Sequence, residues 1–308
     1  MPAMVRTVST WALRSALLLA AACSSIPPVN PAAEQHVTAA ETQVTAGAFD
    51  QARTELDEVA GERCPKRLRD RRDVALATAW RGLGDDWEAF RVLEPFPDLY
   101  PHSDLRGKVV DMEWEIGDKL SKSDRGFLFF WSDARAARVV LEHLITRHPD
   151  TTRLADALKI LGDMAFADGD YPLAQARYRD LMLNRPDSEW FGYAQFRFAM
   201  SIVACIEGPE YDLDRMQAAV KELRSFLAGN SEQADLVRQA REAEQRVLEM
   251  QIQRHLAIAG FYRRIGNLAG QRHHLTIAAS TEFASTPQHR DAIEALNALP
   301  RSGAGSTP

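Results

Sequence analysis

The stretch LGDMAFADGDYPLAQARYRDLMLNRPDS, residues 161–188, indicates how this chain folds. Apolar and small residues recur on both sides of Gly169 at the spacing of amphipathic helices, and Pro186 ends the second helix. The first stripe consists of Leu158, Leu161, Gly162 and Ala165, and the second of Tyr171, Ala174, Tyr178, Leu181 and Met182. Glycine suits the turn between two helices, and small residues let the helices approach closely. The stretch therefore predicts a helical hairpin that must stack on neighbouring hairpins.

Similar units recur along the chain. The triplet Gly169, Tyr171 and Ala174 has a counterpart of equal spacing in Gly47, Phe49 and Ala52, and a weaker one in Gly84, Trp87 and Ala89. Second helices are also predicted before Pro149 and over residues 211–227, with a last hairpin turning near Gly266. The pattern resembles the tetratricopeptide repeat, a helical hairpin of about 34 residues. We expect an all-α, TPR-type α-solenoid of about five to six helical hairpins, without strands.

Composition and the positions of glycine and proline divide the 308 residues into five segments. We predict a lipoprotein signal peptide over 1–22, a Pro-rich tether over 23–33, N-terminal hairpins over 34–126, C-terminal hairpins over 127–300 and a disordered tail over 301–308. Residues 233–265 form either one long helix or two helices joined by a kink. The formal net charge is −6 and no basic stripe is present, so the sequence gives no support to nucleic-acid binding.

The first residues are typical of a bacterial targeting segment. Arg6 and Arg14 flank a short apolar run, residues 15–22, which ends in three alanines before Cys23. This arrangement resembles a lipobox, although alanine stands where leucine is usual. We expect lipidation of Cys23, palmitate included, and the absence of Asp at Ser24 favours the outer membrane, with the chain facing the periplasm. A plain secretory signal is the alternative.

The C-terminal half resembles the BamD family of outer-membrane lipoproteins over roughly residues 140–295. The stretches that carry the resemblance are YRDLMLNRPDSEW (178–190), RFAMSIV (197–203), GPEYDLDRMQAAVKELRSFL (208–227), FYRRIGN (261–267) and ASTP (284–287). Residues 34–130 match only as generic repeats. The resemblance implies a groove that contacts unfolded outer-membrane proteins and the periplasmic domains of the β-barrel insertase, alongside other assembly lipoproteins.

One departure from the family affects the expected insertase contact. Where the family tends to have Asn-Arg, this chain has His273 and His274, and a neutral imidazole is a weaker partner for a carboxylate than a guanidinium. The contact is then lost or made differently. The candidate partner-binding residues are Arg263, Arg264, Arg272 and His274. The alternative function is a TPR lipoprotein scaffold for another envelope process, such as peptidoglycan or trans-envelope coordination.

Other candidate contact residues are less specific. The aromatic run 127–131, including Phe129 and Trp131, either docks a partner or membrane surface or packs onto the repeats. Groove-lining candidates are Gln43, Arg81 and Glu113, which are equally well explained as solvated residues. Cys64 and Cys205 either pair or remain free.

The sequence gives little support to catalysis. Nucleophile-elbow, zinc-protease, phosphate-loop and dinucleotide motifs are absent from it, so we expect a protein that is not an enzyme and needs no cofactor or metal. Paired carboxylates at Asp85 and Asp86 occupy a turn, where they more plausibly cap the following helix.

Overall fold

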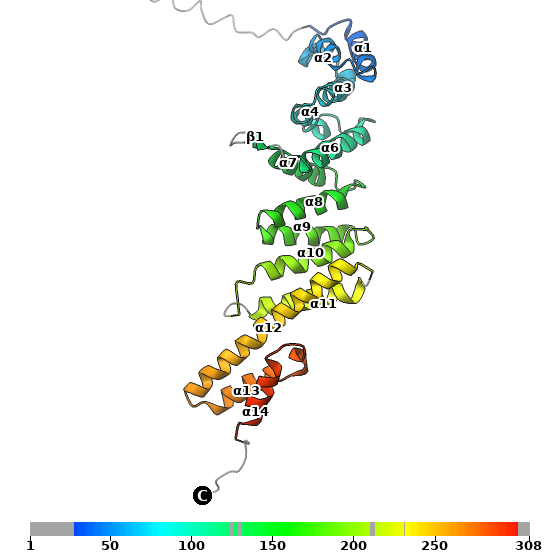
Figure 1. The fold of residues 1–308 in the computed structure, drawn as a ribbon. Coiled ribbons are helices and arrows are strands. Elements are labelled where there is room, and N and C mark those ends of the chain that lie inside the picture. Colours follow the sequence, from blue (N-terminus) through cyan, green and yellow to red (C-terminus); the bar gives the residue numbers. More distant parts are fainter. Residues whose placement is uncertain (1–27, 124–125, 128–130, 210–212, 231, 301–308) are drawn as a thin grey trace, which may run out of the picture. The chain divides into compact units, whose positions relative to one another are not determined.

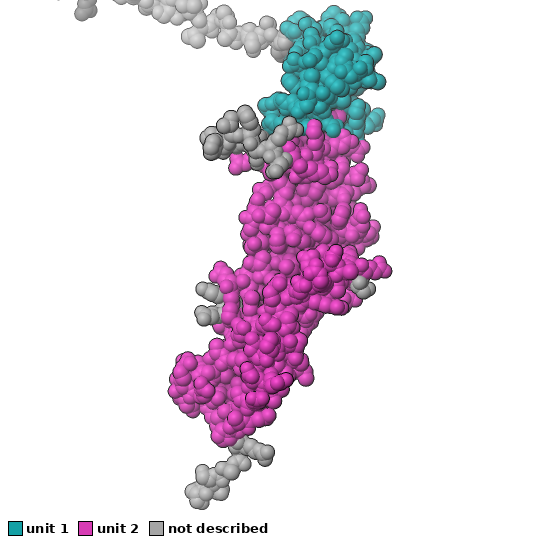
Figure 2. Space-filling view, viewed as in Figure 1, with its two compact units in different colours: residues 1–109 teal, residues 110–308 magenta. Residues whose placement is uncertain are grey.

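A computed structural model describes residues 28–123, 126–127, 131–209, 213–230 and 232–300. They form two compact units that divide after Val109 (Figure 2). The sequence-based division falls after residue 126 instead. The structural division lies within a continuous helix, where neither a change in hydropathy nor a glycine or proline signals a boundary in the sequence. Cys23, the signal peptide, the start of the tether (residues 23–27) and the predicted tail lie outside the described residues.

Unit 1 is a succession of short helices (Figure 1). Its elements are α1 (Ala33–Thr45), α2 (Phe49–Asp57), the 3₁₀ turns Gly61–Arg63 and Lys66–Leu68, α3 (Arg69–Gly82), α4 (Asp86–Leu93), α5 (Phe96–Leu99) and the start of α6 (Arg106–Ser121). Helix α1 packs on α2, α2 on α3 and α3 on α4, and α1 also contacts α3. The core that α1, α2 and α3 share includes the buried residues Val37, Ala52, Leu56, Leu68 and Ala75.

Unit 2 continues the same pattern. It contains the rest of α6, then α7 (Asp133–Arg147), α8 (Leu154–Ala167), α9 (Tyr171–Asn184), α10 (Phe191–Ala204), α11 (Leu213–Gly229), α12 (Ala234–Arg264), α13 (Leu268–Ala278), the 3₁₀ turn Thr281–Phe283 and α14 (His289–Asn297). From α7 onward each helix packs on the next one along the chain. Helix α12 is one unbroken element of 31 residues, which settles the question of one helix or two. An all-α fold with sequential packing is confirmed.

The expectation of no strands is wrong in one place. Between α6 and α7, β1 (Gly126–Phe127) and β2 (Trp131–Ser132) form an antiparallel pair, with Gly126 opposite Ser132 and Phe127 opposite Trp131. Such a pair closes a hairpin loop between two helices, and two-residue strands are too short to produce a pattern in the sequence.

Four helix pairs are joined by the same three-residue turn, centred on Gly47, Gly84, Gly169 and Gly266. In each turn the glycine has φ between 74° and 86°, the left-handed region that glycine tolerates best. The residue after the glycine donates its backbone N–H to a carbonyl five residues earlier: Ala48 to Gln43, Asp85 to Trp80, Asp170 to Ala165 and Asn267 to Tyr262. These bonds are those of the Schellman motif. The predicted turns are therefore confirmed at all four glycines.

Three of these turns also begin the next helix with a side-chain cap. Asp85, Asp170 and Asn267 accept hydrogen bonds from the backbone N–H groups three residues later, at 3.0, 3.1 and 2.9 Å. A cap of this kind satisfies one of the unpaired donors at a helix start. The predicted capping role of the Asp85–Asp86 pair is confirmed for Asp85. The first turn has Ala48 at this position and no side-chain cap.

Small residues bring the helices of a pair together, as the sequence predicts for α8 and α9. A Cβ atom on Gly162 would lie 2.6 Å from the ring of Tyr178, which is itself fully buried. Because this is far inside van der Waals contact, only glycine lets α8 lie on this tyrosine.

Candidate functional site

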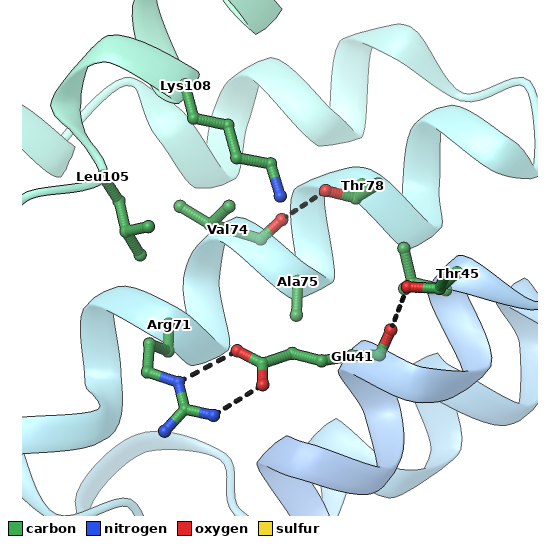
Figure 3. Close-up of a pocket in the computed structure, with 9 residues that line it drawn as sticks. Glu41, Thr45, Arg71, Val74, Ala75, Thr78, Leu105 and Lys108 are labelled. Atoms are coloured by element: carbon green, nitrogen blue, oxygen red, sulfur yellow. Dashed lines mark hydrogen bonds and ion pairs between the residues drawn. The ribbon is translucent and has the colours of Figure 1, made fainter.

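A pocket of about 220 Å³ opens in unit 1 beside the first helices of successive hairpins (Figure 3). Helix α1 contributes one wall, α3 the floor and the start of α6 the other wall. The lining residues are Glu41, Val44, Thr45, Arg71, Val74, Ala75, Thr78, Leu105 and Lys108. The volume is that of a pocket for one or two side chains rather than for a cofactor.

The α6 wall is held in place by two hydrogen bonds to α3. The Tyr100 hydroxyl donates to Asp73 at 2.6 Å, and the Ser103 hydroxyl donates to Asp70 at 2.7 Å. Burial, followed by the hydrogen bond to Asp73, raises the pKa of Tyr100, so this donor keeps its proton. The loop that precedes α6 is thereby fastened to α3, and Leu105 and Lys108 are positioned over the pocket.

Most polar groups in the pocket are satisfied by one another. Arg71 donates two hydrogen bonds to the Glu41 carboxylate, from Nε at 2.9 Å and from Nη2 at 2.5 Å, and this pairing raises the pKa of Arg71. The hydroxyls of Thr45 and Thr78 donate to backbone carbonyls of their own helices. Among these lining residues, Lys108 is the cation that makes no ion pair with the described chain.

The pocket combines an apolar surface with the cation of Lys108. Val44, Val74, Ala75 and Leu105 give an apolar surface, and Figure 3 shows the Lys108 side chain extending across it toward Thr78. An apolar side chain and a neighbouring carboxylate or carbonyl oxygen would satisfy both features. Within the described residues no group of three His, Cys, Asp or Glu side chains is placed to hold a metal ion.

Of the four predicted C-terminal site residues, two are exposed and two contact other parts of the protein. Arg263 and Arg264 end α12 with exposed side chains. Arg272 of α13 donates a hydrogen bond to the carbonyl of Pro300. His274 is half-buried between α12 and α13, with its Nδ1 atom 3.1 Å from Nδ1 of His255. The structure therefore brings Arg263 and Arg264 together at the surface but not His274.

The histidine pair has unusual electrostatics. The His274 ring stacks on Tyr262 at a centroid distance of 5.7 Å. Burial, then the charges of His274, His273 and Arg254, lower the pKa of His255 from 6.5 to about 4, and burial also lowers the pKa of His274. Both rings are therefore neutral at pH 7, and His274 is part of the packing between α12 and α13.

The remaining sequence candidates do not meet at the pocket. Phe129 lies outside the described residues, and Trp131 is described only as backbone of β2. Gln43 lies on α1, and Arg81 on α3 has Nε 3.8 Å from a carboxylate oxygen of Asp86.

Glu113 is fully buried, and its carboxylate lies 3.2 Å from Nδ1 of His143, so it is an interior residue and not a groove residue. Cys64 and Cys205 are free thiols, as one of the two alternatives expected.

Sequence reasoning missed a polar network in unit 2 centred on Asp163. Its carboxylate accepts hydrogen bonds from the hydroxyls of Tyr178 and Tyr193, both at 2.7 Å, and forms an ion pair with Lys159 at 2.9 Å. Burial, then the bond to Asp163, raises the pKa of both tyrosines. Arg197 completes the network with its guanidinium 3.8 Å above the Phe166 ring. The network joins α8, α9 and α10, and the only signal in the sequence was the i, i+4 spacing of Lys159 and Asp163.

No protein-family model and no curated protein matches this chain. None of the helices in the described part of the chain combines the length and apolar character needed to cross a bilayer.

Proposed function

We propose that this chain is a TPR-type α-solenoid of about five to six hairpins that acts as a non-catalytic interaction scaffold. The observation that carries the proposal is the repeated turn. One hydrogen-bonding pattern recurs at Gly47, Gly84, Gly169 and Gly266 in helices that pack in chain order. Stacked hairpins of this kind bind extended segments or helices of other proteins along the surface of their first helices.

The pocket in unit 1 is the proposed contact for such a segment. It lies on α1 and α3, the first helices of two consecutive hairpins, and combines an apolar wall with the cation of Lys108. A bound segment with an apolar side chain beside an acidic group would bury the apolar side chain against Val74 and Leu105. Its acidic group would then lie near Lys108.

The proposed setting is the outer-membrane β-barrel assembly machinery. The support is the resemblance of residues 140–295 to the BamD family, together with the lipobox-like sequence before Cys23. In this proposal Cys23 carries the acyl chains, the protein faces the periplasm, and its partners are the barrel insertase, other assembly lipoproteins and unfolded outer-membrane proteins. The exposed Arg263 and Arg264 remain the candidates for the insertase contact.

Photocrosslinking in live cells tests this function. A photoreactive amino acid replaces Thr45, which lines the pocket, or Thr54, which does not. The two positions are matched, because both threonines are exposed and donate to the carbonyl four residues earlier. We expect adducts with the insertase or unfolded barrel proteins from position 45 and not from 54. Adducts with wall-synthesis or division proteins alone would favour the alternative envelope function.

A charge variant sharpens the test. Lys108→Glu should lower the yield of adduct at position 45 by roughly fivefold, the equivalent of about 1 kcal/mol. Lys66→Glu changes the net charge equally at an exposed residue outside the pocket, and should leave the yield unchanged. Equal effects of the two variants would show that Lys108 has no role in recognition.

A further inference from the structure

The turn between α12 and α13 exposes an unusual amount of apolar surface. Phe261, Ile265 and Leu268 are 49%, 58% and 39% exposed. Phe261 and Ile265 are four residues apart and so lie on one side of the helix end, and Leu268 begins α13. These three are half of the six large apolar residues that are exposed among the described residues of unit 2. Scattered apolar residues need no explanation, but a cluster within eight residues does.

The same region is strongly one-sided in charge. Residues 250–281 contain four arginines but no aspartate or glutamate, although the whole chain has a net charge of −6. Arg263 and Arg264 make no ion pair with any described residue. Elsewhere on the same helix, Arg238 contacts both Asp235 and Glu242. The turn is therefore a cationic surface with no carboxylate of its own to neutralise it.

Helix electrostatics account for only part of this pattern. Cations in the last turn of a helix interact favourably with its dipole, which is sufficient reason for Arg263 and Arg264. This effect does not explain why three large apolar side chains face water beside two unpaired guanidinium groups, because exposed apolar surface stabilises nothing in the isolated protein.

We propose that the tip of the α12–α13 hairpin, residues 261–268, binds the surface of an anionic lipid bilayer. Figure 1 shows α12 and α13 joined by this turn, and α13 packs against the C-terminal part of α12. Phe261, Ile265 and Leu268 enter the boundary between headgroups and acyl chains, while Arg263 and Arg264, in place of an insertase contact, donate hydrogen bonds to lipid phosphates. Charge complementarity selects anionic over neutral lipid.

The position of these residues at the end of a hairpin favours a bilayer over a protein partner. Protein interfaces bury apolar residues in a well-packed centre with a polar rim, and here the apolar residues occupy the end of a hairpin with the cations directly beside them. This proposal rests on the proposed function in one respect: a lipid-anchored chain is held at a membrane, so a weak second contact suffices. The lipid contact itself is tested without the anchor.

The test is co-sedimentation of residues 23–308 carrying Cys23→Ala with lipid vesicles at pH 7. One set of vesicles is pure phosphatidylcholine, and the other is an equimolar mixture of phosphatidylcholine and phosphatidylglycerol. We expect binding to the anionic vesicles alone, weakening as salt is added. Binding to neither set, or equal binding to both, would overturn the proposal and leave the scaffold function to be judged by crosslinking.

Two variants and two matched controls locate the contact. The pair Arg263→Gln and Arg264→Gln should weaken binding to anionic vesicles about 25-fold, at roughly fivefold per arginine. The control pair Arg241→Gln and Arg246→Gln removes the same charge from exposed positions on the same helix, and should have little effect beyond the change in net charge. Equal losses in both pairs would mean that the tip is not the site.

The apolar residues are tested in the same way. Replacing Phe261, Ile265 and Leu268 by serine should weaken binding at least tenfold, whereas Leu183→Ser, at a residue that is 72% exposed on α9, should not. If the arginine pair reduces capture of the insertase but vesicle binding is unchanged, the tip is a protein interface and the lipid proposal is wrong.

Discussion

The environment of individual side chains in this protein is set mainly by the helices that pack against them. His255 on α12 is 5% exposed, and its ring is held against His274 of α13. The Asp163 carboxylate similarly receives groups from three helices. In both cases a polar side chain is fixed by neighbours from other helices. Because burial lowers the pKa of His255, the ionisation of this histidine is linked to the stability of the packed state.

The lowered pKa of His255 predicts that unit 2 loses stability in mild acid. The unfolded chain binds a proton near pH 6.5, and the folded chain does so only near pH 4. Between these values the unfolded state holds more protons, so the free energy of unfolding falls as the pH falls, by about 3 kcal/mol in total. Urea unfolding at several pH values measures this slope.

His255→Gln is the control for this effect, since glutamine is neutral throughout and similar in size. The variant should show a smaller loss of stability between pH 6.5 and 4 than the wild-type protein. Identical pH profiles for the two proteins would mean that His255 is protonated in the folded state at mild acidity.

The contact between Gly162 and Tyr178 predicts a destabilising methyl group. Gly162→Ala places a Cβ atom 2.6 Å from the tyrosine ring, and overpacking of this kind lowers the free energy of unfolding by roughly 1–3 kcal/mol. Gly260→Ala is the matched control, because it is also helical and its Cβ atom would meet nothing within 4 Å. The control should be neutral or stabilised by up to about 1 kcal/mol through helix propensity. Thermal unfolding distinguishes the two.

At the scale of elements, the hairpin turn is the repeated device of the fold. Each turn is closed by backbone hydrogen bonds of its own, and its geometry depends on only two residues, a glycine and the residue after it. Ala48 is the exception, since the equivalent residues Asp85, Asp170 and Asn267 cap the next helix. The backbone at Ala48, with φ −86° and ψ 60°, is close to that of Asp170, at −81° and 69°.

This exception predicts a stabilising substitution. Ala48→Asp should accept a hydrogen bond from the backbone N–H of Gln51 and raise the free energy of unfolding by about 0.5–1 kcal/mol. The reciprocal change, Asp170→Ala, should lower it by a similar amount. A destabilised Ala48→Asp protein would contradict the equivalence of the turns. Denaturant unfolding of both variants provides the comparison.

The turns and helix pairs could be predicted from the sequence because their causes are local. Gly169, Pro186 and the apolar stripe between them lie within one short stretch, and each acts on its immediate neighbours. The pocket and the Asp163 network could not be predicted in this way. Glu41 and Arg71 are 30 residues apart, as are Asp163 and Tyr193, and their meeting depends on how one hairpin rotates against the next. The inward position of His274 likewise follows from the register of α13 on α12.

At the scale of the whole molecule, sequential packing makes most contacts local in sequence. Helix α2 packs between α1 and α3, and α9 between α8 and α10. In such a chain, stability is approximately a sum of hairpin terms and terms between neighbours. Each of the two units accordingly has a core of its own, with Leu56 in one and Leu181 in the other.

Local packing predicts local responses to core mutations. Leu56→Ala should cost about 2–5 kcal/mol within unit 1, and should accelerate amide hydrogen exchange in α1–α3 while leaving α9–α13 unchanged. Leu181→Ala, at an equally buried residue of unit 2, should give the opposite pattern. A loss of protection spread evenly over both units in either variant would show that the chain unfolds as a single cooperative body.

The self-contained turn has a consequence for how such a chain changes over evolutionary time. A glycine and a capping residue are enough to reverse the chain. A duplicated segment of two helices therefore contains all the residues that its own turn requires. Gain or loss of a whole hairpin then leaves the remaining junctions chemically intact. Lineages can lengthen or shorten the array first, and refine the side chains that meet partners afterwards.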